Sequence, residues 1–155
     1  MSEITDTLSH NPFFQGLTSE QLAVLADNAR YENHAAHALI FAHDTPANAF
    51  YVITKGSVRV EIPSLYGAPL VVQNLRAGEV LGWSWLIPPY KCHFDARAMT
   101  ETTVLSIDGS RVLSRCEQDP QLGYELFKRF AGLMSERLTQ ARVQIIETCA
   151  PPEMA

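Results

Sequence analysis

The sequence predicts a mainly β domain with helices at both ends, and three observations support this fold class. Residues 36–108 contain several short segments rich in β-branched and aromatic residues, separated by turn signals. Helical patterns lie on either side, in residues 1–35 and 109–147. The length of 155 residues suits one domain, which we expect to span residues 1–150, with 151–155 as a loose tail.

The N-terminal segment carries a helix start signal. Thr18 is followed three residues later by Gln21, which is the spacing of a capping box. Leu22 and Leu25 then follow at helical spacing. Two phenylalanines in segment 11–14 (Asn-Pro-Phe-Phe) precede this helix, and we expect them to pack the helix onto the core.

The central segment predicts six short strands. Lys55-Gly56 and Tyr66-Gly67 each lie between two strand patterns and predict tight hairpins. Many short strands with regular turns are typical of a sandwich or a barrel. The expected strands are Ala38–Ala42, Phe50–Thr54, Ser57–Ile62, Leu70–Arg76, Phe94–Met99 and Thr103–Ile107.

The C-terminal segment predicts a long helix with one apolar stripe. Asp119-Pro120 is a strong start signal, because Asp accepts from free amides and Pro loses no bond at the first helical position. The stripe is spaced by 3, 4, 4, 3 and 4 residues, as in a coiled coil. Such a stripe packs onto its own core or against a second copy, and its length favours a homodimer. The stripe consists of Phe127, Phe130, Met134, Leu138, Ala141 and Ile145.

Composition and charge argue against several classes of function. A net charge of −5 disfavours a general grip on nucleic acid, which depends on Lys and Arg. No apolar run reaches the roughly 20 residues of a membrane span, and the N-terminus lacks the features of a secretory signal. Cys92, Cys116 and Cys149 form no Cys-x-x-Cys pair. We expect a cytoplasmic protein with reduced thiols and no membrane contact.

Enzyme motifs are absent from the sequence. It contains no Gly-x-Ser-x-Gly elbow, no P-loop and no Rossmann glycine pattern. His34, His37 and His43 raise the alternative of a cupin-like metalloenzyme on a similar barrel. A cupin site needs a His-x-His pair and a downstream Glu, whereas these histidines are spread across a turn. We therefore expect no catalytic residue, no metal and no cofactor.

The order of the elements and several segments resemble the sensor domain of the catabolite activator (Crp/Fnr) family. The resemblance covers nearly the whole chain and implies a cyclic-nucleotide-binding-like double-stranded β-helix, or jelly roll, with a long C-terminal helix that pairs in a dimer. Family activators continue into a helix-turn-helix domain, whereas this chain ends at Ala155, so we expect a stand-alone sensor without direct DNA binding. The matching segments are 11–17 (NPFFQGL), 40–41, 49–53, 56–60, 75–82 (LRAGEVLG), 97–100 and 103–105.

The stretch that matches the family's phosphate cassette departs from its pattern. The resemblance implies a Glu that accepts from the ribose hydroxyl and an Arg that pairs with the cyclic phosphate. Aligned through Gly82, the Glu position falls on Trp83; aligned backwards from Arg97, the Arg position falls on Cys92. Arg97 itself belongs to the following strand and is not the phosphate residue of the family pattern. An expected turn glycine is replaced by Asp44, which a left-handed backbone would tolerate.

Segment 82–95 is therefore predicted to form a rewritten ligand pocket, with alternatives at each position. The two tryptophans and Tyr90 either plug the space or line a site for a flat apolar ligand. Cys92 is either a small buried hydrophobe or a thiolate activated by Lys91 and His93. Lys91 and His93 either end a solvated loop or replace the phosphate grip, and backbone amides around Gly82 can cradle an anion. The predicted ligand-binding residues are Gly82, Trp83, Ser84, Trp85, Tyr90, Lys91, Cys92 and His93.

These features predict a regulatory module that binds a small molecule, nucleotide-like or otherwise, and signals through its dimerising last helix. A ligand can shift that helix only by its differential affinity for two states. Two alternatives stay open: a cyclic nucleotide bound in an altered mode through Lys91 and His93, and a ligand-free dimerisation or scaffold module.

Overall fold

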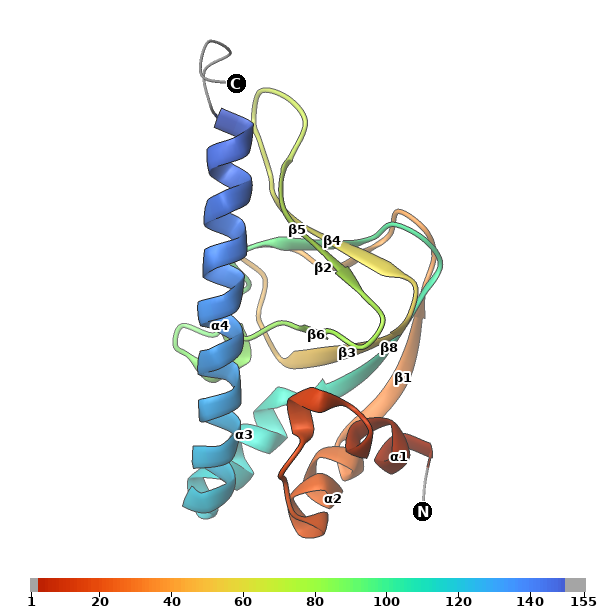
Figure 1. Ribbon diagram of the computed structural model, residues 1–155, viewed down its shortest axis with the longest axis vertical. Helices are drawn as coiled ribbons and strands as arrows, with labels where there is room; N and C mark the ends of the chain where they lie inside the picture. Colours follow the sequence, from red (N-terminus) through yellow and green to blue (C-terminus); the bar gives the residue numbers. More distant parts are fainter. Residues whose placement is uncertain (1–2, 150–155) are drawn as a thin grey trace.

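The computed structural model describes residues 3–149, in which two antiparallel four-stranded sheets form a roll with helices below and beside it (Figure 1). The predicted tail 151–155 lies outside the described residues. The elements are helix α1 (Glu3–Ser9), 3-10 helix η1 (Pro12–Phe14), helix α2 (Ser19–Asp27), strands β1 (Ala29–His34), β2 (Leu39–Phe41), β3 (Ala49–Lys55), β4 (Ser57–Ile62), β5 (Leu70–Arg76) and β6 (Val80–Leu81), 3-10 helix η2 (Ser84–Leu86), strands β7 (Asp95–Ala98) and β8 (Thr102–Asp108), and helices α3 (Gly109–Gln118) and α4 (Pro120–Cys149).

The strand order confirms the predicted jelly roll. One sheet has the order β1-β8-β3-β6 and the other has the order β2-β7-β4-β5, so strands distant in sequence are neighbours in both. The six predicted strands all form, as β2, β3, β4, β5, β7 and β8. The roll with its flanking helices therefore matches the fold class that the sequence predicts.

Strand β1 corrects the prediction of helix for residues 1–35. Helix α2 begins as predicted, with the capping box of Thr18 and Gln21 at N···O distances of 3.1 and 2.9 Å. The helix ends at Asp27, and Ala29–His34 pairs antiparallel with β8. The helical apolar period does not continue beyond α2, so pairing with β8 satisfies this backbone better than another helical turn.

Gly56 joins the two sheets instead of closing a hairpin. Strands β3 and β4 lie in different sheets, so the hairpin predicted at Lys55-Gly56 is wrong. Gly56 has a φ of +97°, and a Cβ there would lie 2.6 Å from the carbonyl oxygen of Glu101. Only glycine fits this crossing. At Tyr66-Gly67 the antiparallel pairing of β4 and β5 is confirmed, but residues 63–69 join them as a longer loop and not as a tight turn.

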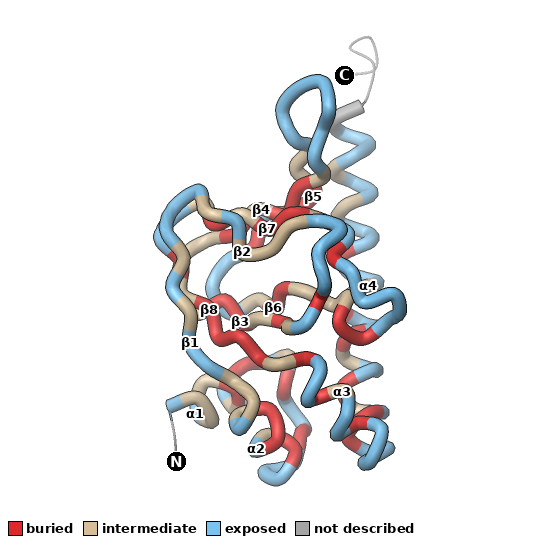
Figure 2. Tube along the Cα trace, turned by 180° about the vertical axis from the view of Figure 1, so that it is seen from behind, coloured by how far each residue is buried: buried red, intermediate tan, exposed pale blue. Residues whose placement is uncertain are grey.

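Aromatic side chains form the centre of the larger of two apolar clusters, between the first sheet and the helices. The Phe130 ring lies 5.0 Å from Phe13, 5.1 Å from Phe50 and 5.3 Å from Trp85, measured between centroids. A second cluster lies between the two sheets. Figure 2 shows buried residues concentrated along the strands, with exposed residues on the β4–β5 loop and the outer turns of α4.

Helix α4 lies along one side of the roll (Figure 1). It begins at Pro120 as predicted, and the Asp119 carboxylate accepts a hydrogen bond from the Leu122 amide at 3.3 Å. Its inward face packs against β5 and α3. Within residues 3–149, no helix has the length and apolar character needed to cross a membrane.

Candidate functional site

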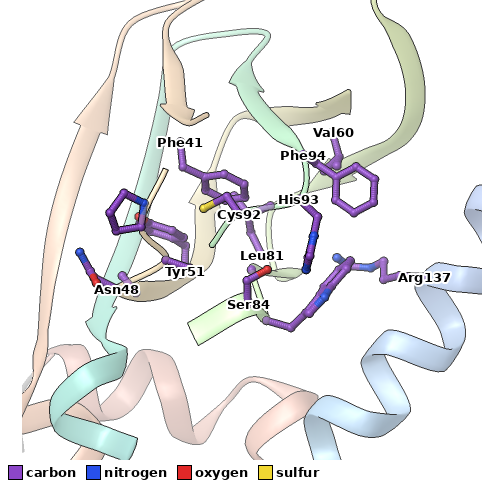
Figure 3. Close-up of a pocket in the computed structure, with 15 residues that line it drawn as sticks. Phe41, Asn48, Tyr51, Val60, Leu81, Ser84, Cys92, His93, Phe94 and Arg137 are labelled. Atoms are coloured by element: carbon purple, nitrogen blue, oxygen red, sulfur yellow. The ribbon is translucent and has the colours of Figure 1, made fainter. Parts of the chain in front are cut away.

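A small apolar cavity of about 40 Å³ lies between the roll and helix α4 (Figure 3). The β2–β3 connection, strands β3, β4 and β6, and segments 82–84 and 92–94 form its walls, and Arg137 of α4 closes one side. Sites for drug-sized ligands usually have roughly 300 Å³ or more, whereas this cavity holds only a few water molecules.

A second cavity of about 100 Å³ lies against α4, next to the first. Val60, Trp83, Phe94 and Arg137 line both cavities and therefore separate them. The Trp83 and Phe94 rings pack edge to face, with centroids 6.0 Å apart and an interplanar angle of 70°. Trp83 is thus part of the partition between two apolar spaces.

Five of the eight predicted ligand-binding residues lie around the first cavity. They are Gly82, Trp83, Ser84, Cys92 and His93. Trp85, Tyr90 and Lys91 do not line it.

The three predicted residues outside the cavity have other surroundings. Trp85 is 1% exposed and stacks on Phe50 in the main core. Tyr90 is partly exposed, has a φ of +57°, and its carbonyl accepts from the Ala47 amide. Lys91 is exposed and forms an isolated β-bridge. Trp85 therefore packs in the main core and does not line the ligand site, which agrees with the alternative in which the tryptophans fill space.

The environment of Cys92 opposes its activation as a thiolate. The side chain is 7% exposed. Burial raises the pKa of the Cys92 thiol above its ordinary value, and a hydrogen bond with Thr45 acts in the opposite direction. Burial, and secondarily the nearby charge of Glu32, also raises the pKa of Tyr51, on the same cavity wall, to about 12. Cys92 thus behaves as the small buried hydrophobe of the first alternative.

Arg137 is the functional candidate that the sequence analysis misses. Its side chain is 3% exposed, and its Nη2 donates to the carbonyl of Val80 at 2.7 Å. Its Nη1 is buried without a hydrogen-bond partner, and the described residues include no salt bridge to this guanidinium. Burial lowers the pKa of Arg137, which Glu79 and Glu136 partly counteract, but a guanidinium remains charged at neutral pH.

The spacing along α4 contains the signal for Arg137. Phe130 and Leu133 are buried on the inward face, and Arg137 follows them by seven and four residues. Positions three, four and seven apart share one face of a helix. An arginine on the buried face of an apolar stripe needs an explanation, because charged side chains are almost never fully buried unless paired.

Arg97 lies outside the cavity, as the family pattern implies. Its Nε lies 3.3 Å from the buried carboxylate of Glu61, and its Nη1 donates to the carbonyl of His37 at 2.8 Å. Arg59 approaches the same carboxylate at 3.6 Å. Arg97 therefore neutralises the buried Glu61 carboxylate within the second sheet.

The histidines do not converge. His34 lies 3.4 Å from Glu32, and His43 lies 3.1 Å from Asp95. In the part of the chain from residue 3 to 149, no group of three His, Cys, Asp or Glu side chains is placed to hold a metal ion. Nothing in this geometry supports the cupin-like alternative.

Phe130 is not available to a partner helix, which corrects the predicted stripe. It is fully buried in its own chain, whereas Phe127, Leu138 and Ile145 are exposed by 44%, 71% and 37%. Met134 and Ala141 are half-buried. The outward stripe with spacings of 3 and 4 residues consists of Tyr124, Phe127, Ala131, Met134, Leu138, Ala141 and Ile145. Of these, Met134 and Ala141 also pack against the core of their own chain.

The family model described as the cyclic nucleotide-binding domain matches residues 31–119. No protein among the curated sequences matches the chain. A Geobacter metallireducens protein assigned to the cyclic nucleotide-binding proteins has 28% identity and a TM-score of 0.79, covering 89% of this chain and 99% of that one.

Two more distant structures share the fold. The sensor domain of the transcriptional regulator DNR from Pseudomonas aeruginosa has 17% identity and a TM-score of 0.72, over 87% of this chain and 91% of that one. The regulatory domain of Toxoplasma gondii PKA, solved with cAMP, has 18% identity and a TM-score of 0.71, over 86% of this chain and 49% of that one.

Proposed function

This chain belongs to the family of cyclic nucleotide-binding domains, and on that basis we propose that it is a non-enzymatic, cytoplasmic sensor that binds a small molecule between the roll and helix α4. One observation carries the proposal: Arg137, which closes the cavity, belongs to the same helix that presents an exposed apolar stripe. A ligand at this place would contact the output helix directly.

Polar contacts connect the cavity with the backbone of α4. Arg137 donates to the carbonyl of Val80 on β6, and β6 leads into Gly82 and Trp83. Gln73 of β5 donates to the Arg137 carbonyl at 2.9 Å and to the side chain of Gln140 at 3.3 Å. A ligand that binds one position of these strands more tightly than another would shift the equilibrium between two positions of α4. The size of this shift would equal the difference between the two binding free energies.

The outward stripe of α4 supports a homodimer as the output. Its residues recur at intervals of 3 and 4, which is the spacing of a coiled-coil seam, and Leu138 is more exposed than Tyr124, Phe127 or Ile145. A second copy of α4 would cover these side chains in an isologous interface. The module needs neither DNA nor a membrane for this output.

The observations favour this sensor over both alternatives. Of the two side chains in the altered-mode alternative, His93 lines the cavity, whereas Lys91 lies outside it and does not replace the phosphate grip of a cyclic nucleotide in this arrangement. The cavity is also much smaller than sites for ligands of nucleotide size. A ligand-free scaffold would give no reason for the buried cation at the cavity wall.

A thermal-shift panel tests ligand sensing. The panel contains cyclic AMP, cyclic GMP and small organic acids, and we expect an organic acid to raise the melting temperature of the wild type. Ala47→Leu, which enlarges a buried lining residue, should remove that rise. Silence across the whole panel would contradict sensing and favour the scaffold.

Light scattering tests the dimer separately. We expect the mass of two chains for the wild type and of one chain for Leu138→Glu, with unchanged circular dichroism. A wild type that has the mass of one chain would rule out the α4 dimer.

A further inference from the structure

We infer that the ligand is an organic anion whose carboxylate binds the guanidinium of Arg137 and whose apolar body lies beside Trp83. This inference rests on the proposed sensing function and specifies the chemical class of the ligand.

The first support is the state of Arg137 itself. A guanidinium has five donors, and burying it without a counter-ion costs free energy. Among the described residues, the carbonyl of Val80 accepts from its Nη2 and Nη1 is buried without a partner. The Arg137 residue lines both cavities. A carboxylate matches the planar fork of a guanidinium and would supply the missing acceptor.

The second support is the charge of the lining. The residues around both cavities include Arg137 and His93 but no Asp or Glu. The chain as a whole carries a net charge of −5, so this is a local reversal of the overall sign. An anion would meet no carboxylate in the lining itself, although the charges of Glu79 and Glu136 also act on Arg137, and low polarity would strengthen its attraction to the guanidinium.

The third support is the largely apolar character of the remaining wall, which favours an organic body over a small inorganic anion. Val60, Trp83 and Phe94 line both spaces, and Met134 lies on the α4 side of the second. Phosphate or sulfate would need several donors, whereas an organic body gains from contact with these side chains. Figure 3 shows Arg137 reaching from α4 toward His93 and Phe94.

Trp83 determines how much space the ligand obtains. The cavities of about 40 and 100 Å³ on its two sides are separated by its half-buried ring and by Phe94. An apolar cavity of roughly 150 Å³ accepts benzene. Rotation of Trp83 would join the two spaces, so a benzoate-sized ligand should bind with a change in the environment of this ring.

The test compares benzoate with benzamide, a neutral molecule of the same shape. Isothermal titration of the wild-type chain should show benzoate binding at least tenfold more tightly than benzamide, which corresponds to about 1.4 kcal/mol. Inorganic phosphate should not bind. Arg137→Gln should weaken benzoate by at least tenfold and leave benzamide unchanged. Arg142→Gln, which removes an exposed charge from the same helix, is the matched control and should change neither.

Equal affinities for benzoate and benzamide would overturn the inference, and this arm needs no variant that must fold. Unchanged benzoate binding in a folded Arg137→Gln would overturn it as well, as would tight binding of inorganic phosphate. Absence of benzoate binding overturns the anion inference alone, because the sensing proposal falls only when the wider thermal-shift panel is also silent.

Discussion

The Phe130→Ala variant should lose about 3–5 kcal/mol of unfolding free energy, because Phe130 is a core residue of its own chain. The side chain is 0% exposed, and its ring contacts Phe13, Phe50 and Trp85 at centroid distances of 5.0 to 5.3 Å. Truncation removes a ring that touches all three and leaves a void between helix α4 and the first sheet. For a domain of this size, the melting temperature should fall by roughly 10 °C.

Urea unfolding, followed by far-ultraviolet circular dichroism, measures this loss at several protein concentrations, so that any dimer contribution can be separated. Leu138→Ala is the control on the same helix. Leu138 is 71% exposed, so its truncation should change subunit stability by less than about 0.5 kcal/mol. A Phe130→Ala loss below about 1 kcal/mol, together with a change of oligomeric mass, would refute the reasoning and return Phe130 to the interface.

Three further predictions concern the crossing glycine, the half-buried Tyr51 and the two buried cysteines. Gly56→Ala should lose at least about 2 kcal/mol of unfolding free energy in the same assay. Gly78→Ala has a similar φ but open space around its Cβ position, so it should lose only about 1 kcal/mol. Equal losses would contradict the clash between the new Cβ and the carbonyl of Glu101. Because the pKa of Tyr51 is raised to about 12, the unfolded chain ionises first, so stability present below roughly pH 10 should fall as pH rises through 12. Tyr51→Phe should show a smaller loss of stability between roughly pH 10 and pH 12, and parallel stability curves for the two proteins would exclude this linkage. Burial raises the pKa of Cys116 to about 11 and also raises that of Cys92. A Cys149→Ser variant, which keeps only these two thiols, should therefore react with a thiol reagent much faster in denaturant than in the native state. Rapid labelling of the native variant would count against the buried placement of Cys92 and Cys116.

The predicted strands and helix starts succeeded where the signal was local. Thr18 with Gln21 and Asp119 with Pro120 form their caps from residues within one turn. Strand β1 was missed because its partner is β8, more than sixty residues away in sequence. The crossing at Gly56 was mistaken for a hairpin because local turn chemistry does not report which sheet each strand joins.

The candidate site was predictable only on the side formed by segment 82–95. Trp83 and Cys92 line the cavity, and their departure from the family pattern was visible by alignment. Trp85 was placed there only because it is close in sequence, yet its ring faces Gly109, where a Cβ would lie 2.8 Å from the Trp85 Cβ. Arg137 comes from a helix more than forty residues later, so its contact with Val80 follows only from the tertiary structure.

Amide hydrogen exchange with and without benzoate tests most directly whether a ligand in the cavity acts on helix α4. We predict slower exchange in residues 80–84 and in the turns of α4 around Arg137 in the wild type, and no such change in Arg137→Gln. Benzoate binding that leaves both segments of the wild type unchanged would contradict the central claim that the cavity and the output helix are coupled.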